Sequence, residues 1–394
     1  MSPEEAKKHG ARAALFDGRW THDLHYGVTD TSTDTSSETS AGAFADSSVK
    51  GHKYGVYYQT SVRLTPGTEA RPGQLLTLAA DHEREEFSQR GVVQDYGAFG
   101  IYDPNQDRSL QTTGYAAEYL AYFGPDVTWS ASARRDDNSD FDDVTTWRTT
   151  ASWNLPAAAT RLHASLGTGQ KAPTFVERYG FYPRQFIGNP TLQPETSKGW
   201  DAGLEQRWLE GRLVTDLTYF RARLEHEING SDCSTFPCTA SNENGTSQRA
   251  GVEFTADAEL ADGYTLNAAY TYTDATQPDT QAGGAQVREL RRPLHTGSVN
   301  LAGHWLGSRL TVNLGAAYTG AREDVVALDT FTEPFTRRAE LDAYTLVSLA
   351  ASYAVTKQLT VYGRIENALD KAYEDVYGYN TPGAAGYVGL RVGL

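Results

Sequence analysis

The final stretch of the chain, Leu359–Leu394, reads LTVYGRIENALDKAYEDVYGYNTPGAAGYVGLRVGL and decides the fold class. Apolar and polar residues alternate along its first part and again along its last part, with an irregular polar loop between them. Successive side chains of a β-strand point to opposite faces, so each part predicts a strand with one apolar and one polar face. The apolar faces carry Leu359, Val361, Gly363 and Ile365, and then Val388, Leu390, Val392 and Leu394. Such strands suit a wall between lipid and water, and a chain that ends on one is predicted to finish a membrane β-barrel.

The same two-residue period recurs along the whole chain. It is clearest over Tyr264–Thr273 and Leu310–Tyr318, and no helical period of comparable length occurs. Short turns such as Ala261-Asp262-Gly263 alternate with long polar connections, which are predicted at Thr31–Ser48, Ser88–Arg108, Asp136–Val144, Lys171–Thr196, Asn229–Thr246, Asp274–Glu289, Gly320–Glu340 and Asp370–Ala385. This alternation predicts an all-β, antiparallel up-and-down transmembrane β-barrel of about 16 strands from Trp20 onward, with short periplasmic turns and long extracellular loops. Part of one more strand is expected at His9–Leu15.

The composition limits the class of protein. Only 39% of the 394 residues are hydrophobic, and no segment approaches the roughly 18 consecutive apolar residues of a membrane-spanning helix. A helical membrane protein is therefore excluded, whereas a β-barrel with a polar interior is not. The net charge is −15 and no basic patch is visible, so we expect acidic loops and no nucleic-acid partner. Because no change of composition marks a linker, residues 1–394 are expected to form one barrel domain.

Several tryptophans lie beside the short turns. Trp153, Trp208 and Trp305 directly precede three of the turns, and Trp20 and Trp129 closely follow two others. Tryptophan prefers the interface between membrane and water, so these residues predict an aromatic girdle on the periplasmic side. Ordinary packing at strand ends is the alternative interpretation.

Three groups of residues, in this order along the chain, carry a resemblance to a known family. Arg134–Thr146 reads RRDDNSDFDDVTT, and Gly167–Trp208 contains Lys171-Ala172-Pro173, Gly188-Asn189-Pro190, Leu192, Pro194-Glu195 and Ser197. The C-terminal stretch contains Asn367, Leu369-Asp370-Lys371, Tyr373, Gly378-Tyr379 and Pro382-Gly383. Together these motifs resemble the barrel of TonB-dependent outer-membrane receptors, and the resemblance covers most of the chain from Trp20 onward.

The resemblance implies a receptor in the outer membrane of a Gram-negative cell, in contact with lipid, that takes up a scarce nutrient and is not an enzyme. Family members also have an N-terminal plug domain that communicates with TonB, and their barrels have about 22 strands. No plug sequence and fewer strands are found here, and the N-terminus has no export signal. We therefore expect a partial receptor barrel, which would contact the TonB system only through a plug outside this chain.

The overall pattern is most similar to the cobalamin receptors of this family, including FVERYGFYP at Phe175–Pro183 and NALDKAYEDVYGYNTPG at Asn367–Gly383. A ferric-siderophore receptor and a passive pore without a plug are the alternatives. One long loop holds the candidate ligand contacts, which are Tyr179, Phe181, Tyr182, Arg184 and Phe186. Aromatic faces with a nearby cation suit a large, partly apolar ligand. Packing of the loop on its neighbours is the other interpretation.

Two cysteines, Cys233 and Cys238, lie close together in the sequence SDCSTFPC. This spacing permits a disulfide across a small loop, which would indicate an oxidising compartment. Two free thiols are the alternative, and a metal site is disfavoured because only His226 is nearby.

A run of carboxylates is the only candidate for a bound ion, and no other cofactor is expected. Carboxylate oxygens are preferred ligands of Ca²⁺, but the run lacks the glycine and the spaced glutamate of an EF-hand loop. A solvated acidic loop is the simpler interpretation. The residues are Asp136, Asp137, Asp140, Asp142 and Asp143.

An enzymatic function has little support in the sequence. His163 and Ser165 lie two residues apart on one predicted strand and are expected to share its inward face. A hydrolase would also need an orienting acid and an oxyanion site. Polar lining of the barrel interior explains the two residues more simply.

Overall fold

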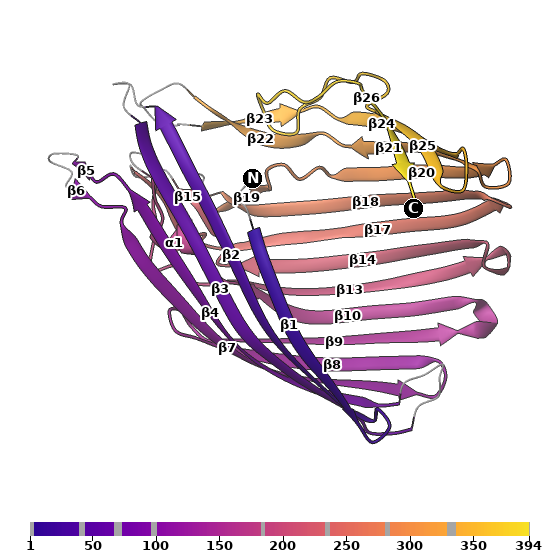
Figure 1. Cartoon of the computed structure of the whole chain (residues 1–394), viewed down its shortest axis with the longest axis horizontal. Helices are drawn as coiled ribbons and strands as arrows, with labels where there is room; N and C mark the ends of the chain where they lie inside the picture. The colour runs from indigo at the N-terminus through magenta and orange to yellow at the C-terminus, as the bar shows by residue number, and fades with distance from the viewer. Residues whose placement is uncertain are drawn as a thin grey trace. The chain divides into compact units, whose positions relative to one another are not determined.

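The computed structural model describes residues 4–38, 44–66, 73–95, 101–182, 186–232, 237–279, 284–328 and 336–393. Within these ranges the chain is almost entirely β-structure, with antiparallel up-and-down strands and one short α-helix (Figure 1). None of the helices found there is both long and apolar enough to span a membrane. The chain divides into two compact units. Unit 1 comprises Met1–Ala151, Ser165–Lys198 and Leu224–Gly245, and unit 2 comprises Ser152–Ala164, Gly199–Arg223 and Thr246–Leu394.

Six long strands of unit 1 pair with one another in chain order, and Figure 1 shows β2, β3, β4 and β7 running side by side. The longest hairpin pairs Trp20 with Val62 at one end and Glu38 with Phe44 at the other. The six strands are β1 (Glu4–Leu15), β2 (Trp20–Glu38), β3 (Phe44–Arg63), β4 (Leu75–Gly91), β7 (Gln106–Phe123) and β8 (Val127–Asn138).

Shorter elements of unit 1 lie in the connections between these long strands. A two-residue pairing joins β5 (Gln94–Asp95) to β6 (Ile101–Tyr102). The helix α1 (Phe175–Tyr179) is followed by a small four-stranded sheet in the order β11-β12-β16-β15. Its strands are β11 (Phe181–Tyr182), β12 (Phe186–Ile187), β15 (Ile228–Asp232) and β16 (Cys238–Asn242).

Unit 2 contains a second antiparallel ladder, β17-β18-β20-β21-β24-β25-β26. Its strands are β17 (Thr246–Ala261), β18 (Tyr264–Asp279), β20 (His295–Trp305), β21 (Leu310–Thr319), β24 (Tyr344–Ala354), β25 (Leu359–Glu366) and β26 (Ala385–Val392). The short β19 (Ala285–Arg288) extends the pairing of β18, and β22 (Arg322–Ala327) pairs with β23 (Thr336–Leu341) in a hairpin of its own. Four of the five boundaries between the units fall within β9 (Val144–Leu155), β10 (Thr160–Lys171), β13 (Glu195–Trp208) and β14 (Leu213–Glu225), and the fifth lies directly before β17.

The two faces of the unit 1 ladder differ sharply in chemistry. On one face Leu24, Val56 and Leu78 are each 47% exposed, and Tyr115 is 53% exposed. The register places Leu24 opposite Tyr58 and Tyr26 opposite Val56, so these side chains form a continuous apolar band. Exposed apolar residues in such a band face lipid in a membrane-spanning barrel. We call this face the outward face, and the opposite face the inward face.

Charged residues crowd the inward face of the same strands. Lys53 on β3 forms ion pairs with Glu83 and Glu85 on β4, at 2.8 and 2.9 Å. Arg134 on β8 reaches across β7 to Asp81 on β4, at 2.7 Å. Gly114 on β7 permits this crossing, because a Cβ atom at that position would clash with the Arg134 guanidinium. The alternation of the sequence therefore places lipid-facing and water-facing side chains on opposite sides of the wall.

The predicted fold class is confirmed, and so is the number of strands. Counting described strands of eight residues or more, sixteen lie between Trp20 and the C-terminus, and β1 precedes them. The chain turns tightly where short turns were predicted, as between β17 and β18, where Gly263 has a φ of +79° that suits glycine. The last strand, β26, ends at Val392, and Leu394 lies outside the described residues.

The predicted long connections are only partly correct. Much of Thr31–Ser48 is strand, because β2 continues to Glu38 and β3 begins at Phe44. The connection Gly320–Glu340 holds the hairpin β22–β23, and Lys171–Thr196 holds α1, β11 and β12. Strands that extend beyond the membrane have water on both faces, so they lose the apolar half of the pattern by which strands are recognised.

The tryptophans predicted to form a girdle are partly exposed. Trp153 and Trp208 are each 50% exposed, Trp305 is 38% exposed and Trp20 is 37% exposed. Trp305 also packs edge-on against Tyr264, with ring centroids 5.3 Å apart. Exposed indole rings beside short turns are what an interfacial girdle requires.

Candidate ligand-binding site

The candidate site is built around α1, which begins directly after the Lys171-Ala172-Pro173 motif. Thr174 is the N-cap: its hydroxyl accepts a hydrogen bond from the Glu177 N–H at 3.2 Å, and the Glu177 carboxylate accepts one from the Thr174 N–H at 2.7 Å. This reciprocal pair is a capping box, which satisfies backbone donors at the start of a helix. The capping box stabilises the start of this helix, which has only five residues and would be too short to be stable in isolation.

Two glutamines on the inward face of the wall hold the segment that follows α1. Gln89 on β4 is only 1% exposed and forms two hydrogen bonds with the backbone of Phe181. Its amide nitrogen donates to the Phe181 carbonyl at 2.5 Å, and its carbonyl accepts from the Phe181 N–H at 3.1 Å. Gln106 on β7 donates to the Tyr179 carbonyl. The loop is thus attached to strands that precede it by more than 70 residues.

Arginines flank the ring of Tyr179 at the end of α1. The guanidinium carbon of Arg108 lies 4.8 Å from the ring centroid, and that of Arg178 lies 5.0 Å from it. The Tyr179 hydroxyl donates to the Asp140 carboxylate at 3.1 Å. Burial, together with this hydrogen bond, raises the pKa of Tyr179 above its ordinary value, although Arg178 opposes the shift. The phenol therefore stays neutral and can donate a hydrogen bond over the physiological pH range.

Arg178 is buried and ties two loops together. It is 6% exposed, and its guanidinium contacts the Asp140 carboxylate at 3.3 Å and donates to the carbonyls of Asp140 at 2.9 Å and Pro190 at 2.8 Å. Pro190 belongs to the Gly-Asn-Pro motif that the sequence singled out. The motif therefore contributes a backbone acceptor for a buried cation.

A cavity of about 460 Å³ lies against α1 on the inward face of unit 1. We call it the inner cavity. Aromatic and basic groups come from the α1 segment and its neighbours, and acidic groups come from β4 and β8. Its lining includes Glu83, Glu85, Arg134, Asp136, Phe141, Phe175, Arg178 and Tyr179. The charges are largely paired, since Arg134 also contacts Asp136 at 2.6 Å. Because its charges are paired, the cavity offers a ligand hydrogen bonds and aromatic faces and not a strong electrostatic field of one sign.

The structure separates the ligand contacts that the sequence predicted. Tyr179 lines the inner cavity, whereas Phe181 is 7% exposed and fastened to Gln89. Tyr182 and Phe186 pack on each other across the β11–β12 pair, with ring centroids 6.4 Å apart. Arg184 lies outside the described residues.

The sequence reasoning missed the residues that the wall contributes to this site. Gln89, Gln106 and Arg108 all lie on the inward face of β4 or β7. Within each strand they are spaced by an even number of residues from Gly114 or from Glu83 and Glu85, so they share the inward face with these residues. That spacing could have indicated a shared face, but residues 88–108 were predicted to form a long connection and not the ends of β4 and β7.

The five aspartates do not converge on a common point. Asp137 and Asp143 pair with Arg135 at 2.8 and 2.7 Å, Asp136 pairs with Arg134, and Asp140 pairs with Arg178. Across the described ranges, no group of three or more histidine, cysteine, aspartate or glutamate residues is arranged to hold a metal ion. In the Asp136–Asp143 loop, the carboxylates form ion pairs with arginines and do not surround a common point.

Cys238 is disulfide-bonded, and the chain's other cysteine, Cys233, lies outside the described residues. Cys238 begins β16, which pairs in parallel with β12, where Phe186 lies opposite Cys238. The cysteine segment therefore belongs to the small sheet that adjoins α1.

In unit 2, His163 and Asp216 form a hydrogen bond of 2.8 Å between Nε2 and Oδ2. The Asp216 carboxylate also accepts a hydrogen bond from the Thr218 hydroxyl at 2.7 Å. Nε2 of His163 is therefore occupied by a hydrogen bond to a carboxylate, as expected for a residue of the polar barrel lining.

A buried aspartate in unit 2 holds the connection between β25 and β26. Asp324 on β22 is fully buried, and its carboxylate accepts hydrogen bonds from the N–H groups of Val325 and Tyr377 and from Arg291, each at 2.8 Å. Burial alone would raise the pKa of Asp324, but the two N–H groups and the guanidinium outweigh it and hold the pKa below its ordinary value. We call this arrangement the Asp324 latch.

Comparison with known proteins places these features in a family. Residues 7–368 match the model of the TonB-dependent receptor-like β-barrel. The chain belongs to this family. Barrels of this family lie in the outer membrane, and the family consists of receptors and not of enzymes, so the expectations of outer-membrane location and of no enzymatic activity agree with the match.

Solved structures of the family share the fold of this receptor barrel. The pyoverdine receptor FpvA of Pseudomonas aeruginosa superposes with a TM-score of 0.72 at 15% identity, over 99% of this chain and 56% of its own. The ferric enterobactin receptor PfeA of the same organism gives 0.75 at 18% identity, over 99% and 62%. The copper transporter OprC gives 0.74 at 13% identity, over 99% and 67%. The barrel thus spans little more than half the length of the pyoverdine receptor.

Proposed function

We propose that this barrel belongs to a receptor that takes up a ferric siderophore, and that the inner cavity forms part of the binding site. The observation that carries the proposal is the position of Tyr179, which lines the inner cavity between Arg108 and Arg178. Uptake driven by TonB would be a property of a whole receptor, of which this chain spans a part.

The chemistry of the cavity suits an iron chelate. A ferric siderophore is a large polar molecule that carries many oxygen acceptors and often a net negative charge. Guanidinium groups donate hydrogen bonds to such oxygens, and the ring of Tyr179, whose hydroxyl is held by Asp140, offers an aromatic face beside them. The aromatic faces of Phe141 and Phe175 can cover the less polar parts of the chelate. The similarity in fold to receptors for pyoverdine and enterobactin supports this ligand class.

Cobalamin is the second candidate ligand. It is favoured by the resemblance of the segments Phe175–Pro183 and Asn367–Gly383 to cobalamin receptors, which stays a prediction. The two candidates differ in charge, since cobalamin has no cluster of anionic metal-binding oxygens. Competition between the two ligands therefore separates the two functions.

Binding of radiolabelled ferric enterobactin, a ferric hydroxamate and cyanocobalamin to the detergent-solubilised chain tests the proposal. We expect an iron chelate to bind, and Tyr179→Ala to weaken its binding about tenfold or more, the usual size for an aromatic contact at the centre of a site. Tyr179→Phe isolates the hydroxyl, and Tyr379→Ala, which alters a loop tyrosine that is 71% exposed, is the matched control. Binding of cyanocobalamin alone would contradict the siderophore assignment, and binding unaffected by Tyr179→Ala would contradict the site.

A further inference from the structure

The outward face of unit 1 changes character toward the extracellular end of its strands. Going up β2, Leu24, Tyr26 and Val28 are followed on the same face by Asp30 and Ser32. The register places Asp30 opposite His52, and His52 opposite Glu86. A polar zone therefore continues the lipid-facing band directly, on the side of the wall that faces the membrane.

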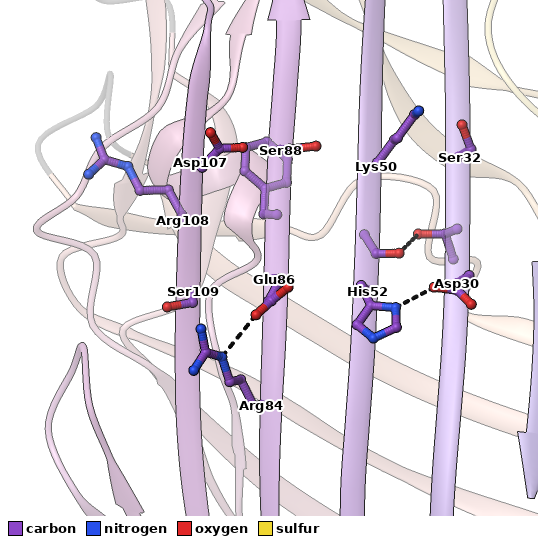
Figure 2. Close-up of a pocket in the computed structure, with 13 residues that line it drawn as sticks. Asp30, Ser32, Lys50, His52, Arg84, Glu86, Ser88, Asp107, Arg108 and Ser109 are labelled. Atoms are coloured by element: carbon purple, nitrogen blue, oxygen red, sulfur yellow. Dashed lines mark hydrogen bonds and ion pairs between the residues drawn. The ribbon is translucent and has the colours of Figure 1, made fainter.

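A pocket of about 800 Å³ occupies this polar zone across β2, β3, β4 and β7 (Figure 2). We call it the outer pocket. Most of its lining side chains share the outward face of the four strands: Asp30, Ser32, Lys50, His52, Arg84, Glu86, Ser88, Asp107 and Ser109. Because it adjoins the apolar band, the pocket lies at the level where the headgroups of the outer leaflet meet the protein.

The acidic groups of the outer pocket already have basic partners. His52 contacts Asp30, Arg84 lies 3.0 Å from Glu86, and Arg90 contacts Asp107 at 2.7 Å. Figure 2 shows the first two of these contacts. Lys50 differs, because it is exposed and has no ion pair or hydrogen-bond partner in the part of the chain that the structure describes. Among the described residues, Lys50 is therefore an unpaired ammonium group on the outward face of the pocket.

Hydroxyl groups lie on both sides of this lysine. The register pairs Lys50 with Ser32 on β2 and with Ser88 on β4, so the three side chains form one row on the outward face. In Figure 2, Lys50 extends from β3 with Ser32 and Ser88 on the flanking strands. An ammonium group between two hydroxyl donors suits a phosphate, and the carboxylates of the neighbouring row can accept hydrogen bonds from sugar hydroxyls.

We propose that the outer pocket binds the phosphorylated sugar headgroup of an outer-leaflet lipid, with Lys50 as the phosphate contact. The acyl chains of such a lipid would lie along the apolar side chains that β2 and β3 present directly below the pocket, which are Val28, Tyr54, Tyr26 and Val56. The lipid would be a fixed part of the receptor's boundary and not its cargo. This site is separate from the inner cavity, because it lies on the opposite face of the same strands.

Native mass spectrometry of the full chain in dodecyl maltoside micelles tests the proposal. The probes are a diacyl glucosamine phosphate lipid and the same lipid without its phosphate. We expect the phosphorylated lipid to bind about tenfold or more tightly than its counterpart, as a charge-assisted hydrogen bond to one phosphate would provide. Lys50→Ala should abolish this preference, Lys50→Arg should retain it, and Lys357→Ala, which alters an exposed lysine in a short turn, should leave it unchanged.

Three results would overturn the proposal. One is an equal affinity for the two lipids, and another is a preference that survives Lys50→Ala. The third is complete displacement of the lipid by millimolar inorganic phosphate, which would indicate a site for the free ion. Because Lys50 is exposed, its replacement is not expected to prevent folding.

Discussion

Val56→Arg is expected to lower the free energy of unfolding in lipid vesicles by about 2–4 kcal/mol, the cost of a cation in the middle of a lipid-facing band. Val56 is 47% exposed and lies opposite Tyr26 on β2 and His82 on β4, within the outward face. An arginine there must either lose its hydration or draw water into the bilayer, and both are unfavourable.

The matched control is Gln59→Arg, three residues along the same strand and on the opposite face. Gln59 borders an inward cavity of about 540 Å³ that is also lined by Ser61, Thr77 and Glu118, so an arginine finds space, water and a carboxylate. We expect this change to cost less than about 0.5 kcal/mol. Urea titration of vesicle-embedded protein, followed by the mobility of unheated samples in gels, measures both values. Equal costs for the two substitutions would contradict the assignment of the faces.

Asp324→Ala is expected to loosen the connection between β25 and β26 by about 2–3 kcal/mol, because it leaves the N–H groups of Val325 and Tyr377 and the Arg291 guanidinium without their common acceptor. The effect should be local, since the latch joins a surface hairpin to a loop. Hydrogen exchange at the Tyr377 amide measures it. Asp324→Asn keeps one acceptor and should cost less. Unchanged protection in Asp324→Ala would show that the latch does not hold the loop.

The pH dependence of the latch follows from the lowered pKa of Asp324. A carboxyl group whose pKa is lower in the folded state stabilises that state above its unfolded pKa of about 3.9, and this contribution is lost as the pH falls through the folded value. Protection of Tyr377 should therefore be constant from neutral pH down to about 4 and decline below it. Asp324→Asn should remove this decline.

The two-residue period was sufficient to predict the strands that cross the membrane. In β25 and β26 each apolar residue alternates with a polar or small one, and the structure pairs Val361 with Leu390 on one face and Arg364 with Tyr387 on the other. The period was insufficient beyond the membrane, where β2 and β3 extend with polar residues on both faces. In that region the pairing of the two strands, and not their amphipathic pattern, defines the structure.

The candidate site was less accessible to prediction than the fold. Tyr179 was predicted as a ligand contact because aromatic and basic residues gather in one loop, and this role stays a prediction. The contacts that hold its segment come from Gln89, Gln106 and Arg108 on distant strands. Nothing local marks a glutamine as the partner of a backbone 92 residues away. The aspartates were interpreted as a solvated acidic loop with calcium as the alternative; Arg134 and Arg135 stand beside them in the sequence, but the pairing of Asp140 with Arg178 becomes visible only when the loops are placed together.

One face of each membrane-spanning strand contacts lipid and the other contacts water. Spin labels placed singly at residues 54 to 60 of β3, in the chain reconstituted in vesicles, report on this division residue by residue. Collision with oxygen, which dissolves in lipid, should be high at Tyr54, Val56, Tyr58 and Thr60. Collision with a water-soluble nickel complex should be high at Gly55, Tyr57 and Gln59. Two opposed oscillations with a period of two residues are predicted, and oscillations of the opposite phase, or none, would show that β3 does not divide lipid from water in this way.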